Sequence, residues 1–191
     1  MKSSYRLNSY SDIFKSLCEL YKPKSILEIG ILDGYSLKSF VENVPVETDI
    51  VAIDLFEMYK FRNSEKSKIE KKFKKNKNVT ILQEDFYEFY KVSSDFDLVH
   101  IDISNDGDIY EFAIKNYFPL TNKALILEGG SQERDSVEWM VKYDKREINP
   151  FLKQISHTYS VEVTEEFPSL TIIDVLKSKM IWNKYHYLKF I

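Results

Sequence analysis

Five apolar runs of this 191-residue chain end in or beside acidic residues, and these acids are the side chains whose type and spacing could do chemistry. In chain order the runs are SILEIG with Glu28, IVAIDLF with Asp54, NVTILQ followed by Glu84 and Asp85, FDLVHID with Asp102, and KALILEGG with Glu128. Carboxylates can accept hydrogen bonds from a ligand, bind a hard cation, or take up a proton. We therefore expect ligand binding and catalysis where these runs end.

The first run leads into a glycine loop, SILEIGILDGYSLKSF, over residues 25–40. A dinucleotide-binding turn needs glycines at its first, third and sixth positions, and counting from Gly30 the later two positions hold Leu32 and Tyr35. A phosphate-binding Walker loop would end in Gly-Lys-Ser/Thr, a sequence this chain does not contain. The loop is therefore expected to hold a nucleoside without a phosphate chain.

A nucleoside at this edge would meet a defined set of side chains. Gly30 and Gly34 permit a tight turn and a close approach, and Ser36 could cap the following helix or bind a ligand carboxylate. Asp54 ends the second run, where an acid typically accepts hydrogen bonds from ribose hydroxyls. Asp85 or Glu84 could accept from an adenine amino group, with the ring of Phe86 against the base.

The elements that must position these residues follow from the alternation of apolar runs with amphipathic stretches. We expect strands at residues 25–30, 50–56, 78–83, 96–102 and 123–130, and helices at residues 12–21, 35–44, 64–75, 86–92, 108–117, 134–143 and 150–154. Residues 159–166 and 170–178 are typical of a hairpin around Pro168. The predicted fold class is α/β, a Rossmann-like, doubly wound, mostly parallel seven-stranded sheet with a C-terminal antiparallel hairpin.

Length and composition favour a single domain. Its expected parts are a helical extension at 1–24, a cofactor-binding core at 25–130, a helical substrate-side segment at 131–155, and a hairpin and tail at 156–191. The net charge is −3, so no global field attracts nucleic acid or an anionic membrane. A single cysteine, Cys18, and the lack of a signal-like or membrane-spanning segment indicate a cytoplasmic protein.

The motifs LEIGILDGYS, VAIDLF, VTILQEDF and FDLVHID, in this order, resemble those of class I S-adenosylmethionine-dependent methyltransferases. The similarity is greatest to the catechol and caffeoyl-CoA O-methyltransferase branch and to small sugar O-methyltransferases, and it spans roughly residues 25–130. The resemblance implies S-adenosyl-L-methionine as cofactor. It places the methionine part beside Glu28, Gly30, Gly34 and Ser36, the ribose at Asp54 with Leu55 beside it, the adenine among Glu84, Asp85 and Phe86, and Asp102 at the rim of the same site.

The same branch commonly uses a divalent metal, held by an acid after strand four and an acid-amide pair after strand five. This resemblance implies a Mg²⁺ site at Asp102 and Glu128, although Gly129 stands where the amide would fall. Asp106 or Asp108 could supply a third oxygen. Relatives often carry a basic residue three positions after the strand-four acid, where this chain has Asn105.

The candidate catalytic residues follow from these departures. We rank Asp102 first, Glu128 second and His100 third. For His100, a buried, hydrogen-bonded core role is the alternative. The chain lacks the Asn/Asp-Pro-Pro-aromatic turn of enzymes that methylate a base amine, so an oxygen acceptor is favoured. Polar and aromatic residues after strand five could grip a small polar or sugar-like acceptor or pack on the sheet: Glu133, Arg134, Asp135, Trp139, Met140 and Tyr143.

Two other functions stay open at this point. The lysine-rich stretch from Lys66 to Lys77 is typical of a solvated helix, but it could serve an RNA-directed methyltransferase by neutralising phosphates. Asn105 and Gly129 would also suit a non-catalytic adenosyl-binding subunit. The tail MIWNKYHYLKFI predicts either cover for the domain's own core or a homodimer contact.

Overall fold

The structure is a computed structural model, and it describes residues 10–61, 63–164 and 169–188, with the side chains of the last helix described through residue 181. The chain divides into two compact units, residues 1–103 and residues 104–191. The expectation of a single domain stays a prediction. Among the described residues, every helix is too short or too polar to span a lipid bilayer.

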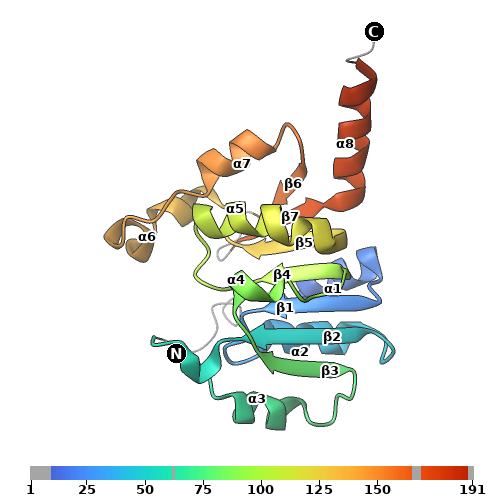
Figure 1. The fold of residues 1–191 in the computed structure, drawn as a ribbon, viewed down its shortest axis with the longest axis vertical. Helices are drawn as coiled ribbons and strands as arrows, with labels where there is room; N and C mark the ends of the chain where they lie inside the picture. Colours follow the sequence, from blue (N-terminus) through green and yellow to red (C-terminus); the bar gives the residue numbers. More distant parts are fainter. Residues whose placement is uncertain (1–9, 62, 165–168, 189–191) are drawn as a thin grey trace. The chain divides into compact units, whose positions relative to one another are not determined.

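The first unit alternates strands and helices. Its elements are α1 (Tyr10–Tyr21), β1 (Ser25–Ile29), α2 (Tyr35–Asn43), β2 (Asp49–Asp54), the 3₁₀ helix η2 (Phe56–Met58), α3 (Lys66–Phe73), β3 (Val79–Gln83), α4 (Phe86–Phe89) and β4 (Phe96–Ile101). The strands are parallel and take the order β3-β2-β1-β4. Figure 1 shows them side by side, with α3 beyond the edge strand β3.

This strand order creates a reversal point at β1, which pairs with β2 on one side and with β4 on the other. In the register, Ile29 pairs with both Ile53 and Ile101. Gly30, Asp54 and Asp102 therefore leave the sheet at the same level. Ligands bind at such a point in open α/β sheets.

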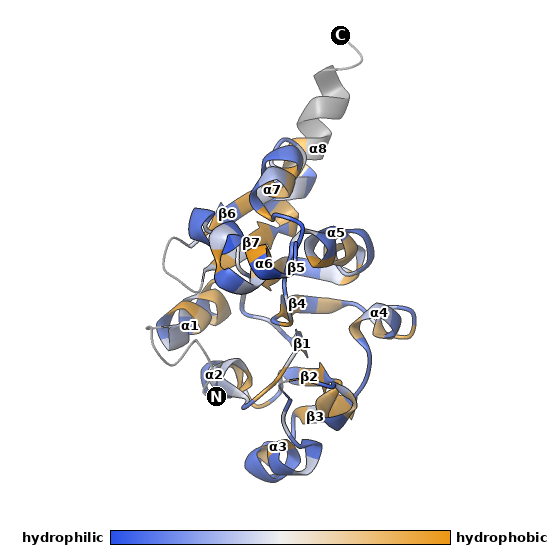
Figure 2. Cartoon of the chain, turned by 90° about the vertical axis from the view of Figure 1, so that its left-hand side faces the viewer, coloured by the Kyte–Doolittle hydropathy of each residue, from blue (hydrophilic) through white to orange (hydrophobic). Residues whose placement is uncertain are grey.

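The strands of the first unit are apolar because helices cover both faces of the sheet. Helices α1 and α2 lie on one side of β1–β4 and α4 lies on the other (Figure 2). Ile26, Leu98 and Val99 are almost fully buried, and so are Phe14 of α1 and Phe40 of α2. A continuous apolar run is what a strand buried on both faces requires.

The second unit is built on an antiparallel group of strands in the order β5-β7-β6. Its elements are α5 (Gly107–Asn116), η3 (Phe118–Leu120), β5 (Thr121–Glu128), η4 (Gln132–Ser136), α6 (Glu138–Lys142), α7 (Asn149–Ile155), β6 (Ser160–Val163), β7 (Leu170–Asp174) and α8 (Val175–Leu188). The predicted α/β class, with seven strands that are mostly parallel and an antiparallel C-terminal pair, is confirmed.

Two predicted elements differ from the structure. The helix predicted for residues 134–143 is divided into η4 and α6, because Val137 between them is extended. The second hairpin strand was predicted to run to Ser178, but it ends at Asp174 and α8 begins at Val175. Asp174 starts this helix by accepting a hydrogen bond from the amide of Lys177 at 2.8 Å. The aromatic tail residues Trp182, Tyr185, Tyr187 and Phe190 lie outside the described side chains.

Candidate cofactor site

The glycine loop begins at Gly30, in a backbone conformation that only glycine adopts readily, with φ of +90°. A Cβ atom at this position would lie 2.0 Å from the carbonyl oxygen of Asp102. The amide of Gly30 donates to the Ile53 carbonyl at 2.9 Å, and the amide of Asp102 donates to the Ile29 carbonyl at 2.8 Å. The ends of β1, β2 and β4 are thus tied together at Gly30.

Asp54 holds the loop in place with its carboxylate. Oδ2 accepts from the amides of Ile31 at 2.7 Å and Leu32 at 3.2 Å, and Oδ1 accepts from the amide of Phe56 at 2.8 Å. A carboxylate has about four acceptor positions, so these bonds orient the group and leave about one position for a ligand hydroxyl. Sequence reasoning gave Asp54 to the ribose, but it did not find this second role in the loop.

The same bonds bear on which ligand the loop can hold. Phosphate-binding loops present free backbone N–H groups. Here the amides of Ile31 and Leu32 donate to a carboxylate, and the amide of Gly34 donates to the Ile31 carbonyl at 2.7 Å. These occupied donors, beside the negative charge of Asp54, support the expectation that the ligand carries no phosphate here.

Glu28 and Ser36 meet below the loop. Glu28 is fully buried, and its Oε1 accepts a hydrogen bond from the hydroxyl of Ser36. Its other oxygen, Oε2, is buried without a hydrogen-bond partner among the described residues. The hydroxyl of Ser36 therefore binds Glu28, and α2 begins after Gly34 without a side-chain cap.

His100 lies in the core of the first unit. It is fully buried, and its ring contacts those of Phe14 and Phe40, with centroids 5.3 and 5.6 Å away. Its Nδ1 is 3.7 Å from Oε1 of Glu28. A ring enclosed in this way cannot reach a methyl acceptor without moving, which favours the structural role over the catalytic one.

On the side predicted for adenine, Glu84 is exposed and Phe86 is buried. Asp85 is the N-cap of α4 and accepts from the amide of Tyr87 at 2.8 Å. The amide of Glu84 donates to the Asp54 carbonyl at 3.1 Å, which links the ends of β2 and β3. The carbonyl of Leu55 accepts from the side-chain amide of Gln83 at 3.0 Å. These residues lie at the adjoining strand ends, as the sequence indicated, and their contact with adenine stays a prediction.

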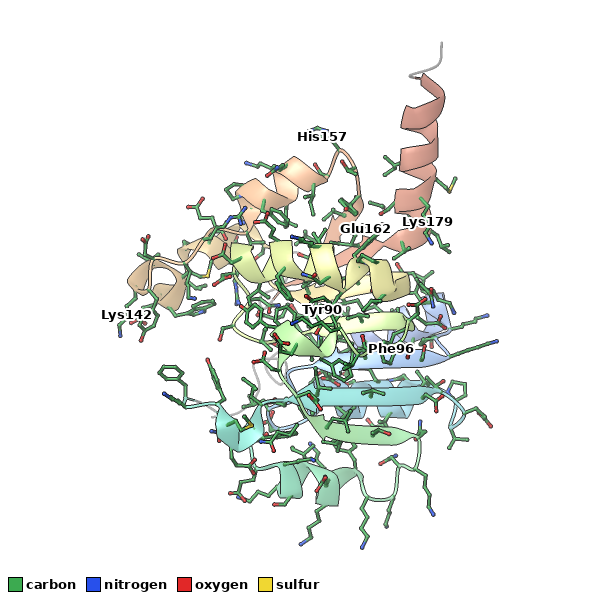
Figure 3. All side chains as sticks on the ribbon, in the orientation of Figure 1. Tyr90, Phe96, Lys142, His157, Glu162 and Lys179 are labelled. Atoms are coloured by element: carbon green, nitrogen blue, oxygen red, sulfur yellow. The ribbon has the colours of Figure 1, made fainter. Side chains whose placement is uncertain are left out.

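Helix α3 supports the loop in a way that sequence reasoning missed. The ammonium group of Lys72 donates to the carbonyls of Asp33 at 2.5 Å and Gly34 at 3.4 Å. A Cβ atom at Gly34 would lie 2.9 Å from the ring of Phe73. The helix is mostly hydrophilic (Figure 2), and its side chains extend away from the strands at the lower edge of Figure 3. No pattern in the sequence distinguishes Lys72 from its neighbouring lysines.

In the second unit, Glu128 at the end of β5 forms a buried ion pair. Its Oε1 accepts from Nη1 of Arg134 at 3.0 Å, and its Oε2 lies 2.8 Å from Nη2 of the same guanidinium. Both residues are buried, with relative exposures of 5% and 6%. To act as a base or as a metal ligand, Glu128 would first have to give up this ion pair with Arg134.

Neighbouring residues complete a polar network around Glu128. Asn105 is fully buried, and its side-chain amide donates to the carbonyl of Glu128 at 2.8 Å. The hydroxyl of Tyr110 donates to the same carbonyl at 3.3 Å, and burial raises the pKa of this phenol. Asn105 therefore fixes the end of β5, which gives an amide a structural role at the position where the resemblance implied a base.

The acids suggested as further metal ligands also have structural partners. Asp106 caps α5 through Oδ1, and its Oδ2 lies 3.1 Å from the ammonium of Lys145. Asp108 pairs with Arg146 at 3.2 Å. Asp102 belongs to the first unit and Glu128 to the second. Within the described part of the chain, no group of three or more His, Cys, Asp or Glu residues could hold a metal ion.

The segment after β5 uses its charged residues internally. Arg134 pairs with Glu128, and the carboxylate of Asp135 accepts from the amides of Ile148 at 2.7 Å and Asn149 at 2.9 Å. Glu133 stays exposed, and Lys142 lies at the outer end of α6 (Figure 3). Two of the charged residues that were predicted to bind an acceptor, Arg134 and Asp135, are therefore bonded within the protein.

Comparison with known proteins gives a family match. The profile of a family described as O-methyltransferase matches residues 8–145. No curated protein matches the chain at a significant level. An O-methyltransferase from Bacillus cereus in complex with SAH has 16% identity and a TM-score of 0.65, covering 92% of this chain and 82% of its own.

Two further solved structures have the same fold. One, named as a candidate caffeoyl-CoA O-methyltransferase from Staphylococcus aureus, has 19% identity and a TM-score of 0.62, covering 87% of this chain and 83% of its own. The other, named as a candidate rRNA methylase from Clostridium thermocellum, has 14% identity and a TM-score of 0.59, covering 91% and 98%. At such identities the likenesses show the fold alone.

Proposed function

Since the chain belongs to the O-methyltransferase family, we propose that it transfers the methyl group of S-adenosylmethionine to an oxygen atom of a small polar acceptor, for example a sugar-like molecule. The predicted class of S-adenosylmethionine-dependent methyltransferases is confirmed by the family match. The acceptor and the roles of individual residues belong to the proposal.

The carboxylate of Asp54 is the observation that carries the cofactor assignment. Its bonds to Ile31 and Leu32 occupy donors that a phosphate would need, and they leave it positioned for a ribose hydroxyl. S-adenosylmethionine carries a sulfonium, an ammonium and a carboxylate group but no phosphate, so its net positive charge suits a loop flanked by Glu28 and Asp54. Glu28 is fully buried, so we assign it a role beneath the methionine end, where its negative charge favours the ammonium group of the ligand and its carboxylate holds Ser36.

Methyl transfer from S-adenosylmethionine is a direct displacement, so the protein need not form a covalent bond with either substrate. Bound S-adenosylmethionine supplies an electrophilic methyl group, and the protein must align an acceptor oxygen in line with it and remove the acceptor's proton. Asp102 follows β4 at the same level as Gly30 and Asp54, so we keep it as the first candidate to orient the acceptor or accept its proton. The resemblance implies Mg²⁺ as well, but both oxygens of Glu128 already face the guanidinium of Arg134.

The RNA-directed alternative is weaker because three of the four lysines of α3 have local partners. The ammonium nitrogen of Lys66 lies 3.7 Å from Oε1 of Glu70, and that of Lys68 lies 2.6 Å from Oε1 of Glu65. Lys72 donates to a carbonyl of the glycine loop. Each of these contacts diminishes the charge free to neutralise phosphate. Steeply salt-dependent binding to RNA would revive this alternative.

Thermal-shift measurements test the proposal. SAH is expected to raise the melting temperature, NAD is not, and Asp54→Ala should abolish the response to SAH. Asp49→Ala is the matched control, because Asp49 is an exposed acid at the opposite end of the same strand. The proposal fails if SAH leaves the melting temperature unchanged, or if both variants respond alike.

Two further points are proposals. We infer a cytoplasmic location because the only cysteine, Cys18, is a buried thiol, which suits a reducing compartment. A homodimer through the C-terminal tail is the second, and the molar mass in solution would decide it.

A further inference from the structure

The carboxylate of Glu128 is held by a guanidinium in a geometry that uses both of its oxygens. The two Arg134 nitrogens lie 3.0 and 2.8 Å from Oε1 and Oε2, and both side chains are buried. Paired N–H···O bonds of this kind are among the strongest that proteins form, because the planar fork of arginine matches a carboxylate.

The surroundings of Arg134 form a built site for this guanidinium. Nη2 also donates to the backbone carbonyl of Asn105 at 3.1 Å, and the guanidinium carbon lies 5.0 Å from the ring centre of Trp139. A Cβ atom at Gly129 would lie 3.4 Å from Cγ and Nε of Arg134. Gly129 also has a φ of +105°, which residues with a side chain rarely adopt, and this backbone conformation accounts for a glycine where the resemblance expects an amide.

A divalent cation does not fit this arrangement. Mg²⁺ needs carboxylate oxygens at about 2.0–2.1 Å, and both oxygens of Glu128 already face a cation. Gly129 has no side-chain oxygen to offer, and Asp106 and Asp108 are bound to Lys145 and Arg146. The fixed charge of Arg134 would also repel a second cation at the same carboxylate.

We infer that Arg134 is the resident cation at the end of β5, and that this enzyme binds no divalent metal at Glu128. The inference rests on the proposed function, since the metal is implied by the O-methyltransferase resemblance. Arg134 is then a positioning residue. It holds η4 and Trp139 of α6 against the end of β5, which places the segment from Gly129 to Lys142 without a metal ion.

Electron paramagnetic resonance of Mn²⁺ tests this directly, because protein-bound Mn²⁺ loses the sharp signal of the hydrated ion. The full chain is titrated with Mn²⁺, with and without SAH, alongside Glu128→Gln and the control Glu162→Gln, which alters an exposed acid of the same unit that was never a candidate ligand. We expect equal free Mn²⁺ signals for the wild type and both variants. A one-to-one site in the wild type that Glu128→Gln removes would overturn the inference.

A second variant and a second measurement complete the test. If Glu128→Gln does not fold, Asp102→Asn replaces it, since a site shared by both acids would lose Mn²⁺ in either variant. The melting temperature of the wild type should be the same in Mg²⁺ and in EDTA, and a fall in EDTA that Mg²⁺ reverses would contradict the inference. The thermal shift by SAH on the same samples separates the two claims, because its absence contradicts the proposed function alone.

Discussion

Replacing Arg134 by methionine should destabilise the protein far more than the same change at Arg146. Removing one partner of a buried ion pair leaves an uncompensated charge and costs about 3–5 kcal/mol. The side chains of Arg134 and Glu128 are 7% and 6% exposed, which places them in this class. Methionine keeps much of the apolar stem of arginine, so the change reports mainly on the lost charge and its hydrogen bonds.

Arg146 is the matched control because it also pairs with two acids, Asp108 and Glu111, in the same unit. Its side chain is 41% exposed, and those of its partners are 72% and 57% exposed. Pairs in water contribute about 0–1 kcal/mol. For a chain of this size, 1 kcal/mol corresponds to about 2–4 °C, so Arg134→Met should lower the melting temperature by about 6–20 °C, and Arg146→Met, which loses two exposed pairs, by at most about 8 °C.

Differential scanning calorimetry of the whole chain measures both variants. The double change Glu128→Leu with Arg134→Met should recover much of the loss, because it removes both buried charges. Similar melting temperatures for the two arginine variants would refute the reasoning, and so would a double variant less stable than Arg134→Met. Either result would mean that the Arg134–Glu128 pair is not the buried, mutually compensating interaction described above.

Three further changes probe the first unit. Gly30→Ala should lower SAH affinity at least about tenfold by titration calorimetry, because its Cβ would meet the Asp102 carbonyl at 2.0 Å, and unaltered affinity would contradict this. Lys72→Met should weaken SAH binding several-fold by releasing the glycine loop, whereas Lys71→Met on the same helix should not; equal affinities would rule out a support role for α3. Burial raises the pKa of Cys18 to about 12, so the folded protein should resist a thiol reagent at about pH 8 and react only on unfolding. Because the folded thiol keeps its proton above the unfolded value of 9.0, this group should lower stability as pH rises from about 9 to about 12, measured by denaturant titration; a Cys18→Ala variant with the same slope would argue otherwise.

The sequence was sufficient for the fold because its signals are local and repeated. Apolar runs such as ALIL in β5 are continuous where a strand is buried, and the glycine loop follows the first of these runs directly. The register of parallel strands then brings Gly30, Asp54 and Asp102 to one edge without further information. The acids could thus be placed together from chain order alone.

The partners of those residues could not be predicted, because they depend on side-chain direction after a turn. Arg134 lies in a stretch that was expected to grip an acceptor or to pack on the sheet, and its ion pair with Glu128 was not predicted. Lys72 is one of several lysines on α3, and only the packed structure shows that it reaches the glycine loop. The strand expected across Asp174 ends there because this side chain caps α8, a competition between helix and strand that periodicity does not resolve.

A crystal structure with bound SAH tests the central claim most directly. The adenosyl group should lie over the loop from Gly30 to Gly34, with a ribose hydroxyl within hydrogen-bond distance of Asp54 and the amino group of the ligand near Glu28. Density for SAH at another place, or Asp54 still bonded only to the loop with no ligand beside it at saturating SAH, would contradict the account.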